Sequence, residues 1–171
     1  MHAEQAIALL VAALASASDL RTRRIPNLLT FTAAGIGLVY HLLAHGWSGA
    51  AWSLVGAALG LVLFLPVFAL GGLGAGDVKL AAALGACVGV PDVLVVVVAG
   101  AIAGGVLAIV VGFVTGYLRQ ALRNVGVLLM HWRVEGVRPL DSLTLSSAPG
   151  PRLPYAVPLA VGVLYSIWRQ S

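Results

Sequence analysis

This sequence consists largely of long apolar runs. Short breaks between the runs hold most of its charged residues and prolines. Hydrophobic residues make up 60% of the 171 residues and charged residues only 9%, far below the roughly 25% typical of soluble domains. In a bilayer an apolar segment must satisfy its own backbone hydrogen bonds, and a helix does so within one segment. We therefore predict an all-α fold, with residues 1–171 forming one integral-membrane domain.

Six runs are predicted to form transmembrane helices, although some are shorter than the roughly 20 residues that cross a bilayer core. The first is predicted to be retained and not cleaved as a signal peptide, because residues 1–5 hold Glu4 and no Lys or Arg, whereas arginines follow the run. Gly46 to Gly49 is predicted to form a turn between the second and third spans. The approximate ranges are 3–19, 28–44, 50–70, 78–90, 93–117 and 153–168.

The basic residues predict the orientation of these spans. Six spans with both termini outside place nine of the ten Lys and Arg residues in the cytoplasm and leave only Arg169 outside. The cytoplasmic nine are Arg21, Arg23, Arg24, Lys79, Arg119, Arg123, Arg133, Arg138 and Arg152. Membrane orientation explains the net charge of +4, so no nucleic-acid partner is predicted.

A polar segment of about residues 119–152 is predicted to lie in the cytoplasm. Between Leu118 and Val134, apolar residues at helical spacing alternate with arginines. This pattern favours an amphipathic helix on the lipid surface, and an irregular loop is the alternative. Residues 139–152 are rich in serine and proline and are predicted to form a loop.

A glycine-dense break from Gly71 to Lys79 separates the third and fourth runs and contains Asp77. Its glycines allow a tight turn and the close approach of another chain. A carboxylate at a membrane boundary is costly to place, which makes Asp77 a functional candidate. The alternative is structural, because Asp77 is also predicted to be the N-cap of the fourth helix.

Asp19, at the inner end of the first run, is a second carboxylate at the same predicted membrane face, whereas Asp92 falls at the opposite face. Two carboxylates held close together do not both ionise readily. The ionised one can take a proton from water while the protonated one polarises a carbonyl. Asp19 and Asp77 are thus a candidate pair for water activation, and Gly74 and Gly76 would leave room for a substrate backbone.

No metal site or cofactor is predicted. His41 and His45 lie one helical turn apart, a spacing that can bind a metal, but no third ligand is evident nearby. They are therefore interpreted as interfacial histidines. Cys87 is the only cysteine, so an intrachain disulfide and a cysteine-based zinc site are excluded.

Three segments occur in a recognisable order: Ser18 to Asn27 ending in Ile-Pro-Asn, Gly74 to Lys79 reading Gly-Ala-Gly-Asp-Val-Lys, and Leu153 to Pro158. Together they resemble the prepilin peptidases, membrane aspartic proteases of the GxGD type. The resemblance implies that Asp19 and Asp77 are the catalytic pair. It implies supporting positions at Gly74, Gly76, Lys79, Pro26, Asn27, Pro154, Tyr155 and Pro158.

The resemblance also implies the substrate, which is the leader of type IV pilin-like precursors, cut at the cytoplasmic face of the bacterial inner membrane. Only seven residues separate Asp19 from Asn27, so the Cys-x-x-Cys insertion associated with N-methylation is missing there and no methyltransferase activity is predicted. The chain is similar to the short members that serve Flp/Tad-type pili. Archaeal preflagellin peptidases share the aspartate pair and remain an alternative.

Weaker roles are assigned to the remaining charged residues near the pair. Arg21, Arg23 and Arg24 are interpreted mainly as topology determinants that could also contact substrate or lipid. Lys79 could bias the carboxylates or extend to the membrane interface. The rival hypothesis is a non-catalytic membrane protein, a small transporter or assembly factor that uses the glycine break for helix packing. The sequence leaves open the oligomeric state, the cut-site preference and which carboxylate is the base.

Overall fold

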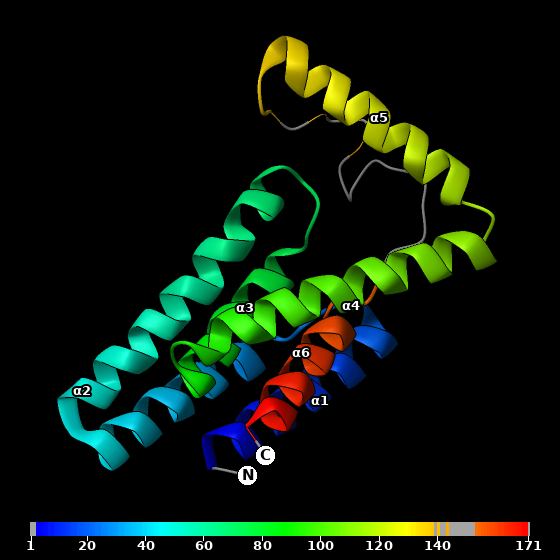
Figure 1. Cartoon of the computed structure of the whole chain (residues 1–171). Helices are drawn as coiled ribbons and strands as arrows, with labels where there is room; N and C mark the ends of the chain where they lie inside the picture. Colours follow the sequence, from blue (N-terminus) through cyan, green and yellow to red (C-terminus); the bar gives the residue numbers. More distant parts are fainter. Residues whose placement is uncertain (1–2, 139, 141–142, 144–152, 171) are drawn as a thin grey trace.

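The structure is a computed structural model that describes residues 3–138, 140, 143 and 153–170. All long secondary-structure elements in this part of the chain are α-helices, which confirms the all-α prediction (Figure 1). The helices are α1 (Ala3–Thr22), α2 (Asn27–Ala69), α3 (Ala75–Val88), α4 (Asp92–Val114), α5 (Leu118–Glu135) and α6 (Ala156–Arg169).

The 43-residue helix α2 is bent back on itself at Gly46, which has φ 66° and ψ −152° (Figure 1). This left-handed backbone conformation costs glycine little and other residues much more. The bend divides α2 into two arms, residues 27–45 and 47–69. The predicted four-residue turn is thus too long, since residues 47–49 are helical and one glycine reverses the chain.

Helix α3 packs against both arms of α2 through backbone-to-backbone contact. Gly37 of the first arm lies against Ala86, and Gly56 of the second arm lies against Gly85. A methyl group on Gly56 would collide with the carbonyl oxygen of Gly85. These contacts need small residues on both helices, as is common where membrane helices pack closely.

The last carbonyls of α3 are satisfied by side chains of α2. Ser53 Oγ donates to the Ala86 carbonyl at 2.8 Å, and His41 Nε2 lies 2.9 Å from the Cys87 carbonyl. A helix ends with four carbonyls that have no partner within the helix, and leaving them buried and unpaired is costly. One hydrogen bond from each arm therefore stabilises the end of this short helix.

Helices α1 and α6 lie side by side in opposite directions (Figure 1). Gln5 Nε2 donates to Gln170 Oε1 at 2.7 Å at one end of the pair, and the Ala156 N–H donates to Asp19 Oδ2 at 3.3 Å at the other. The termini of the chain consequently share one end of the molecule, and the two candidate carboxylates lie toward the other.

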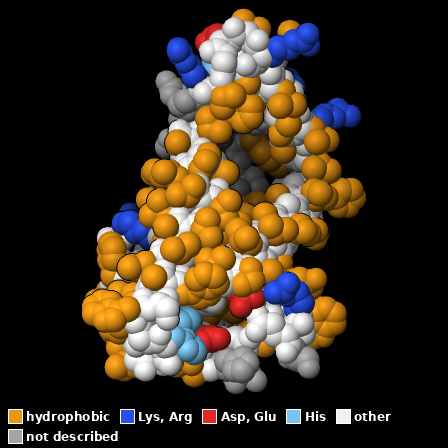
Figure 2. All heavy atoms as spheres, turned by 60° about the vertical axis from the view of Figure 1, so that its left-hand side comes forward, with side chains coloured by type: hydrophobic (Ala, Val, Ile, Leu, Met, Phe, Trp, Pro, Cys, Tyr) orange, Lys and Arg blue, Asp and Glu red, His pale blue; other side chains and the backbone are white. Residues whose placement is uncertain are grey.

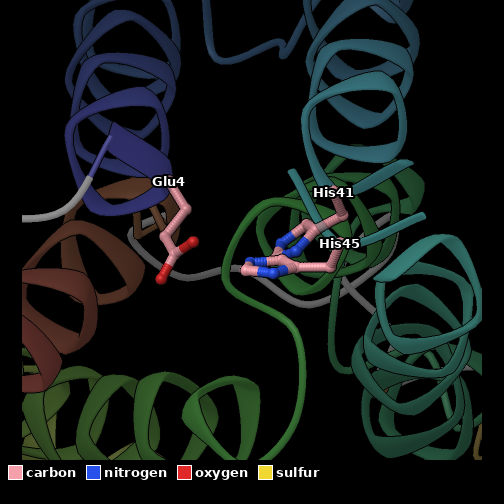
Figure 3. A group of neighbouring side chains, drawn as sticks. All are labelled: Glu4, His41 and His45. Atoms are coloured by element: carbon pink, nitrogen blue, oxygen red, sulfur yellow. The ribbon is translucent and has the colours of Figure 1, made fainter. Parts of the chain in front are cut away.

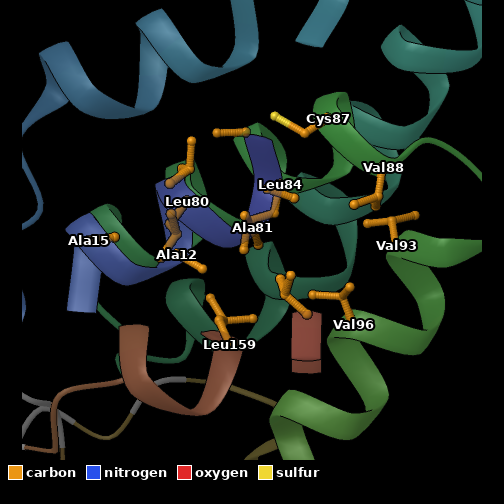
Figure 4. Close-up of a cluster of buried hydrophobic side chains, with 14 of the residues drawn as sticks. Ala12, Ala15, Leu80, Ala81, Leu84, Cys87, Val88, Val93, Val96 and Leu159 are labelled. Carbon is orange, nitrogen blue, oxygen red and sulfur yellow. The ribbon is translucent and has the colours of Figure 1, made fainter. Parts of the chain in front are cut away.

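The core lies where α1, α3, α4 and α6 meet (Figure 4). Its largest fully buried apolar side chains include Leu80 and Leu84 of α3, Val93 and Val96 of α4, and Leu159 of α6. Small residues of α1 such as Ala12 and Ala15 complete it. α3 is therefore the central helix, with nine of its fourteen residues buried.

Large apolar side chains cover much of the surface, as Figure 2 shows for one face. Soluble monomers rarely expose contiguous apolar patches of such extent. Among the described helices, α1, α2 and α4 are long and apolar enough to cross a membrane by length and composition. These findings indicate a membrane protein. α3 and α6 have fourteen residues each, so their crossing of the bilayer and the orientation of the termini remain predictions.

Helix α5 confirms the predicted helix at about 118–134 and extends it by one residue. It has no buried residue and lies apart from the other helices (Figure 1). The last helix begins at Ala156, three residues later than predicted, so Pro154 precedes it. Most of the predicted loop at 139–152 lies outside the described residues.

Substitution of Gly56 tests the close packing of α2 on α3. We expect Gly56→Val to lower stability by about 2 kcal/mol or more, because the side chain would overlap the Gly85 backbone. Gly35→Val is the matched control on the same helix, since nothing lies within 4 Å of a methyl group there. Thermal unfolding in detergent compares the two, and equal Tm values would contradict the packing described above.

Candidate active site

Asp19 lies in the last turn of α1 and is 7% exposed. Its Oδ2 accepts a hydrogen bond from the N–H of Ala156, the first residue of α6, at 3.3 Å. The first N–H groups of a helix have no partner within the helix, and a carboxylate is a favourable acceptor for them. Asp19 thereby joins the end of α1 to the start of α6.

The turn after Asp19 is fixed by two hydroxyl groups. Ser18 Oγ and Thr22 Oγ1 both donate to the carbonyl of Arg24, at 2.8 and 3.2 Å. Arg23 has φ 54°, which allows the chain to leave the helix sharply toward Pro26, the N-cap of α2. No hydrogen-bonding role was predicted for Ser18 or Thr22 from the sequence, although hydroxyl side chains beside a turn are a known signal for such bonds.

Asp77 is the third residue of α3 and not its N-cap, so that prediction is wrong. Gly74 takes the N-cap position in an extended conformation, and its N–H donates to Asp77 Oδ2 at 3.1 Å. The Asp77 N–H returns a bond to the Gly74 carbonyl at 3.1 Å. The Asp77 carboxylate thus accepts a hydrogen bond from the N–H of the N-cap residue of its own helix, in the manner of a capping box.

Both carboxylates lie near the start of α6. Asp77 lines the same cavity as Tyr155. Tyr155 precedes Ala156, whose N–H binds Asp19. Two acids that are distant in the sequence are therefore brought to the same end of the bundle.

The Tyr155 ring is packed from two sides. It meets the Phe64 ring edge-on, with ring centroids 5.7 Å apart and planes at 74°. On α4, Gly104 leaves room for it, because a methyl group there would lie 2.9 Å from the Tyr155 ring. The contacts of Phe64 and Gly104 with Tyr155 were not predicted from the sequence. Pro158 is buried near Gly100 of α4.

Lys79 and Asn27 connect the first turns of α3 and α2. Lys79 Nζ donates to Asn27 Oδ1 at 2.9 Å and lies 5.8 Å from the centre of the Phe31 ring. The ammonium group is thus held by an amide and an aromatic face. Gly76 lies against Ile25, where a methyl group would come within 3.3 Å of the Ile25 Cβ.

The three arginines predicted to contact substrate or lipid, Arg21, Arg23 and Arg24, are exposed. They follow Asp19 directly and so lie at the same end of the bundle as the two carboxylates. This placement agrees with their interpretation as topology determinants and leaves their contacts with a substrate as a prediction.

An apolar cavity of about 430 Å³ reaches Asp77 from the side. The second arm of α2 forms one wall through Leu63 and Val67, and α4 forms the other. Gly105 and Ala108 belong to that second wall, and Tyr155 also lines the cavity. Asp77 is the only carboxylate among the described residues that line it.

A second group of polar side chains lies elsewhere in the molecule. Glu4, His41 and His45 bring three potential metal-ligand atoms within 4.8 Å of one another (Figure 3). The expectation that no third ligand lies near the two histidines is therefore wrong. Glu4 is 37 positions upstream of His41, and only the packing of α1 beside α2 brings it there.

Two substitutions of Tyr155 distinguish the packing of its ring from the contribution of its hydroxyl group. We expect Tyr155→Ala to lower stability by about 2 kcal/mol, because the contact with Phe64 is lost. Tyr155→Phe keeps that contact and is expected to unfold at the wild-type temperature. Thermal unfolding in detergent measures both, and a wild-type Tm for Tyr155→Ala would contradict a packing role.

Comparison with known proteins gives one family. No curated protein and no solved structure gives a significant match to the chain. A model of the type IV leader peptidase family matches residues 6–109, which is more than half of the chain and includes both Asp19 and Asp77. The third segment of the sequence resemblance, at 153–158, lies outside the matched range. The chain belongs to the type IV leader peptidase family.

Proposed function

We propose that the chain is a membrane aspartic endopeptidase that removes the leader of type IV pilin-like precursors, with Asp19 and Asp77 activating water. One observation carries the proposal: Asp19 on α1 binds the N–H of Ala156, and Asp77 on α3 lines a cavity together with Tyr155, the residue before Ala156. The family membership supports a leader peptidase in general. The catalytic assignment rests on the chemistry of the pair.

In the proposed mechanism, one carboxylate is ionised and the other protonated. The ionised carboxylate accepts a proton from water as the water oxygen attacks the scissile carbonyl. The protonated one donates to the carbonyl oxygen, and a proton then passes to the leaving amine. The backbone bonds from Ala156 and Gly74 each hold one carboxylate oxygen. They orient the two side chains without using a third acid, and either carboxylate can serve as the base.

The apolar cavity beside Asp77 supports the proposed substrate class. Pilin-like precursors carry an apolar helix directly after the leader, according to the family resemblance. The walls formed by α2 and α4 would hold such a segment with its first residues next to Asp77. The small residues Gly105 and Ala108 leave space for side chains or an extended backbone.

The finer features of the proposal follow from the sequence. The short connection from Asp19 to Asn27 favours the form of the family that serves Flp/Tad-type pili. The arginines near the carboxylates favour a cytoplasmic site in a bacterial inner membrane. Cys87 is buried in the core, so it offers no exposed thiol for metal binding, and trimming without methylation is proposed.

Cleavage of a purified Flp-type precursor tests the proposal. Wild-type protein in detergent is expected to shorten it, and Asp19→Asn and Asp77→Asn are each expected to reduce the rate at least about 100-fold. Asparagine keeps a carbonyl oxygen to accept the N–H of Ala156 or Gly74, so folding should be retained. Mass spectrometry of the products gives the cut site.

Asp92→Asn is the matched control, because Asp92 lies at the other end of the bundle and bonds Arg169 and Gln170. This variant should cleave at the wild-type rate. Full activity in either Asp19→Asn or Asp77→Asn would refute the two-carboxylate mechanism.

A larger side chain at Gly105 tests the cavity as the substrate groove. Nothing lies within 4 Å of a methyl group at Gly105, so Gly105→Phe should fold and fill the groove. We expect kcat/KM for the precursor to fall about tenfold or more. Ile109→Phe, on α4 but outside the groove, is the control. Equal kcat/KM values for the two variants would place substrate binding elsewhere.

A further inference from the structure

We infer that Glu4, His41 and His45 form a binding site for a divalent transition metal, with Zn²⁺ the best match. The side chains come from the first turn of α1 and the end of the first arm of α2, and they point toward one another (Figure 3). Their ligand atoms lie within 4.8 Å of one another. This inference does not depend on the proposed peptidase mechanism.

A hydrogen bond at one ring nitrogen of His41 leaves the other ring nitrogen suited to binding a metal. The side chain is 4% exposed, and its Nε2 lies 2.9 Å from the carbonyl oxygen of Cys87. A carbonyl can only accept, so Nε2 carries the proton and Nδ1 keeps its lone pair. A backbone carbonyl that fixes the other nitrogen is the usual partner of a metal-binding histidine.

The three ligands can close around an ion by small side-chain rotations. Ligands about 2.1 Å from a tetrahedral Zn²⁺ lie roughly 3.4 Å apart, so the group, whose ligand atoms lie within 4.8 Å of one another, must contract by at most roughly 1.4 Å. His45 is exposed and Glu4 is half-buried, so both can move toward the buried His41. The adjacent cavity of about 510 Å³, which also borders Ser48 and Trp52, gives access from solvent.

The types of ligand in this group indicate which metals it would bind. Two imidazoles and one carboxylate suit Zn²⁺ and similar transition metals, whereas Mg²⁺ and Ca²⁺ prefer oxygen ligands throughout. Asp92 borders the same cavity, but Arg169 and Gln170 bind its Oδ1 at 3.3 and 2.7 Å. Three protein ligands leave a coordination position open for water.

The site lies far from the candidate carboxylates. Glu4 and Asp19 stand fifteen positions apart on α1, or roughly 22 Å along the helix axis. A bound ion would connect the start of α1 with the bend of α2 near Gly46. Its expected effect is on stability and on helix placement at this end, with no part in peptide hydrolysis.

Zn²⁺ binding to the full-length protein in detergent, stripped of metal by a chelator, tests the site. Isothermal titration calorimetry with ZnCl₂ is expected to give one ion per chain. Glu4→Gln and His45→Ala should each weaken binding at least about tenfold, because each removes one ligand. His131→Ala, which removes an imidazole on α5, is the matched control and should bind as wild type.

Thermal unfolding gives a second readout. At a Zn²⁺ concentration roughly 100 times the Kd, the Tm of wild type and His131→Ala should rise by about 5 °C or more. The Tm of Glu4→Gln and His45→Ala should not respond at the same concentration. Failure of wild-type protein to bind Zn²⁺ would overturn the inference, as would wild-type affinity in both ligand variants.

Discussion

Backbone contact between α3 and the two arms of α2 is the constraint on which the rest of the structure depends. α3 is only fourteen residues long, yet nine of its residues are buried and it carries Asp77. The small residues at the contact with α2 let the helices approach closely, and Ser53 and His41 satisfy the carbonyls at its end. The position of Asp77 follows from this packing, because Asp77 is in the first turn of the same rigid helix.

Backbone amides at helix starts organise the candidate site. The Ala156 N–H binds Asp19, and the Gly74 N–H binds Asp77, so each acid also satisfies a helix terminus. The structural and the catalytic interpretations of Asp77 are therefore compatible. A carboxylate that satisfies a helix start is held in place, and orientation is what a base that activates water requires.

The helices were predictable from the sequence because long apolar runs favour helices, and α1, α2 and α4 are long and apolar enough to cross a membrane. The placement of Asp19 and Asp77 near the start of α6 agrees with the prediction that both lie toward the same end of the bundle. The local geometry at the helix ends was not predictable from the sequence. Whether Gly74 or Asp77 caps α3 depends on one extended glycine, and the approach of Glu4 to the histidines depends on how α1 packs on α2. Neither leaves a periodic signal in the sequence.

The shortness of α3 has a consequence for water near its ends. Fourteen residues make a helix roughly 21 Å long, about 9 Å less than a typical hydrocarbon core. Most of α3 is covered by neighbouring helices and not by lipid, and both α2 and α4 are longer than α3. If those neighbours cross the hydrocarbon core, α3 ends below the membrane surface and leaves a recess that water can enter. Asp77, in the first turn of α3, would then meet water at the depth of the lipid chains.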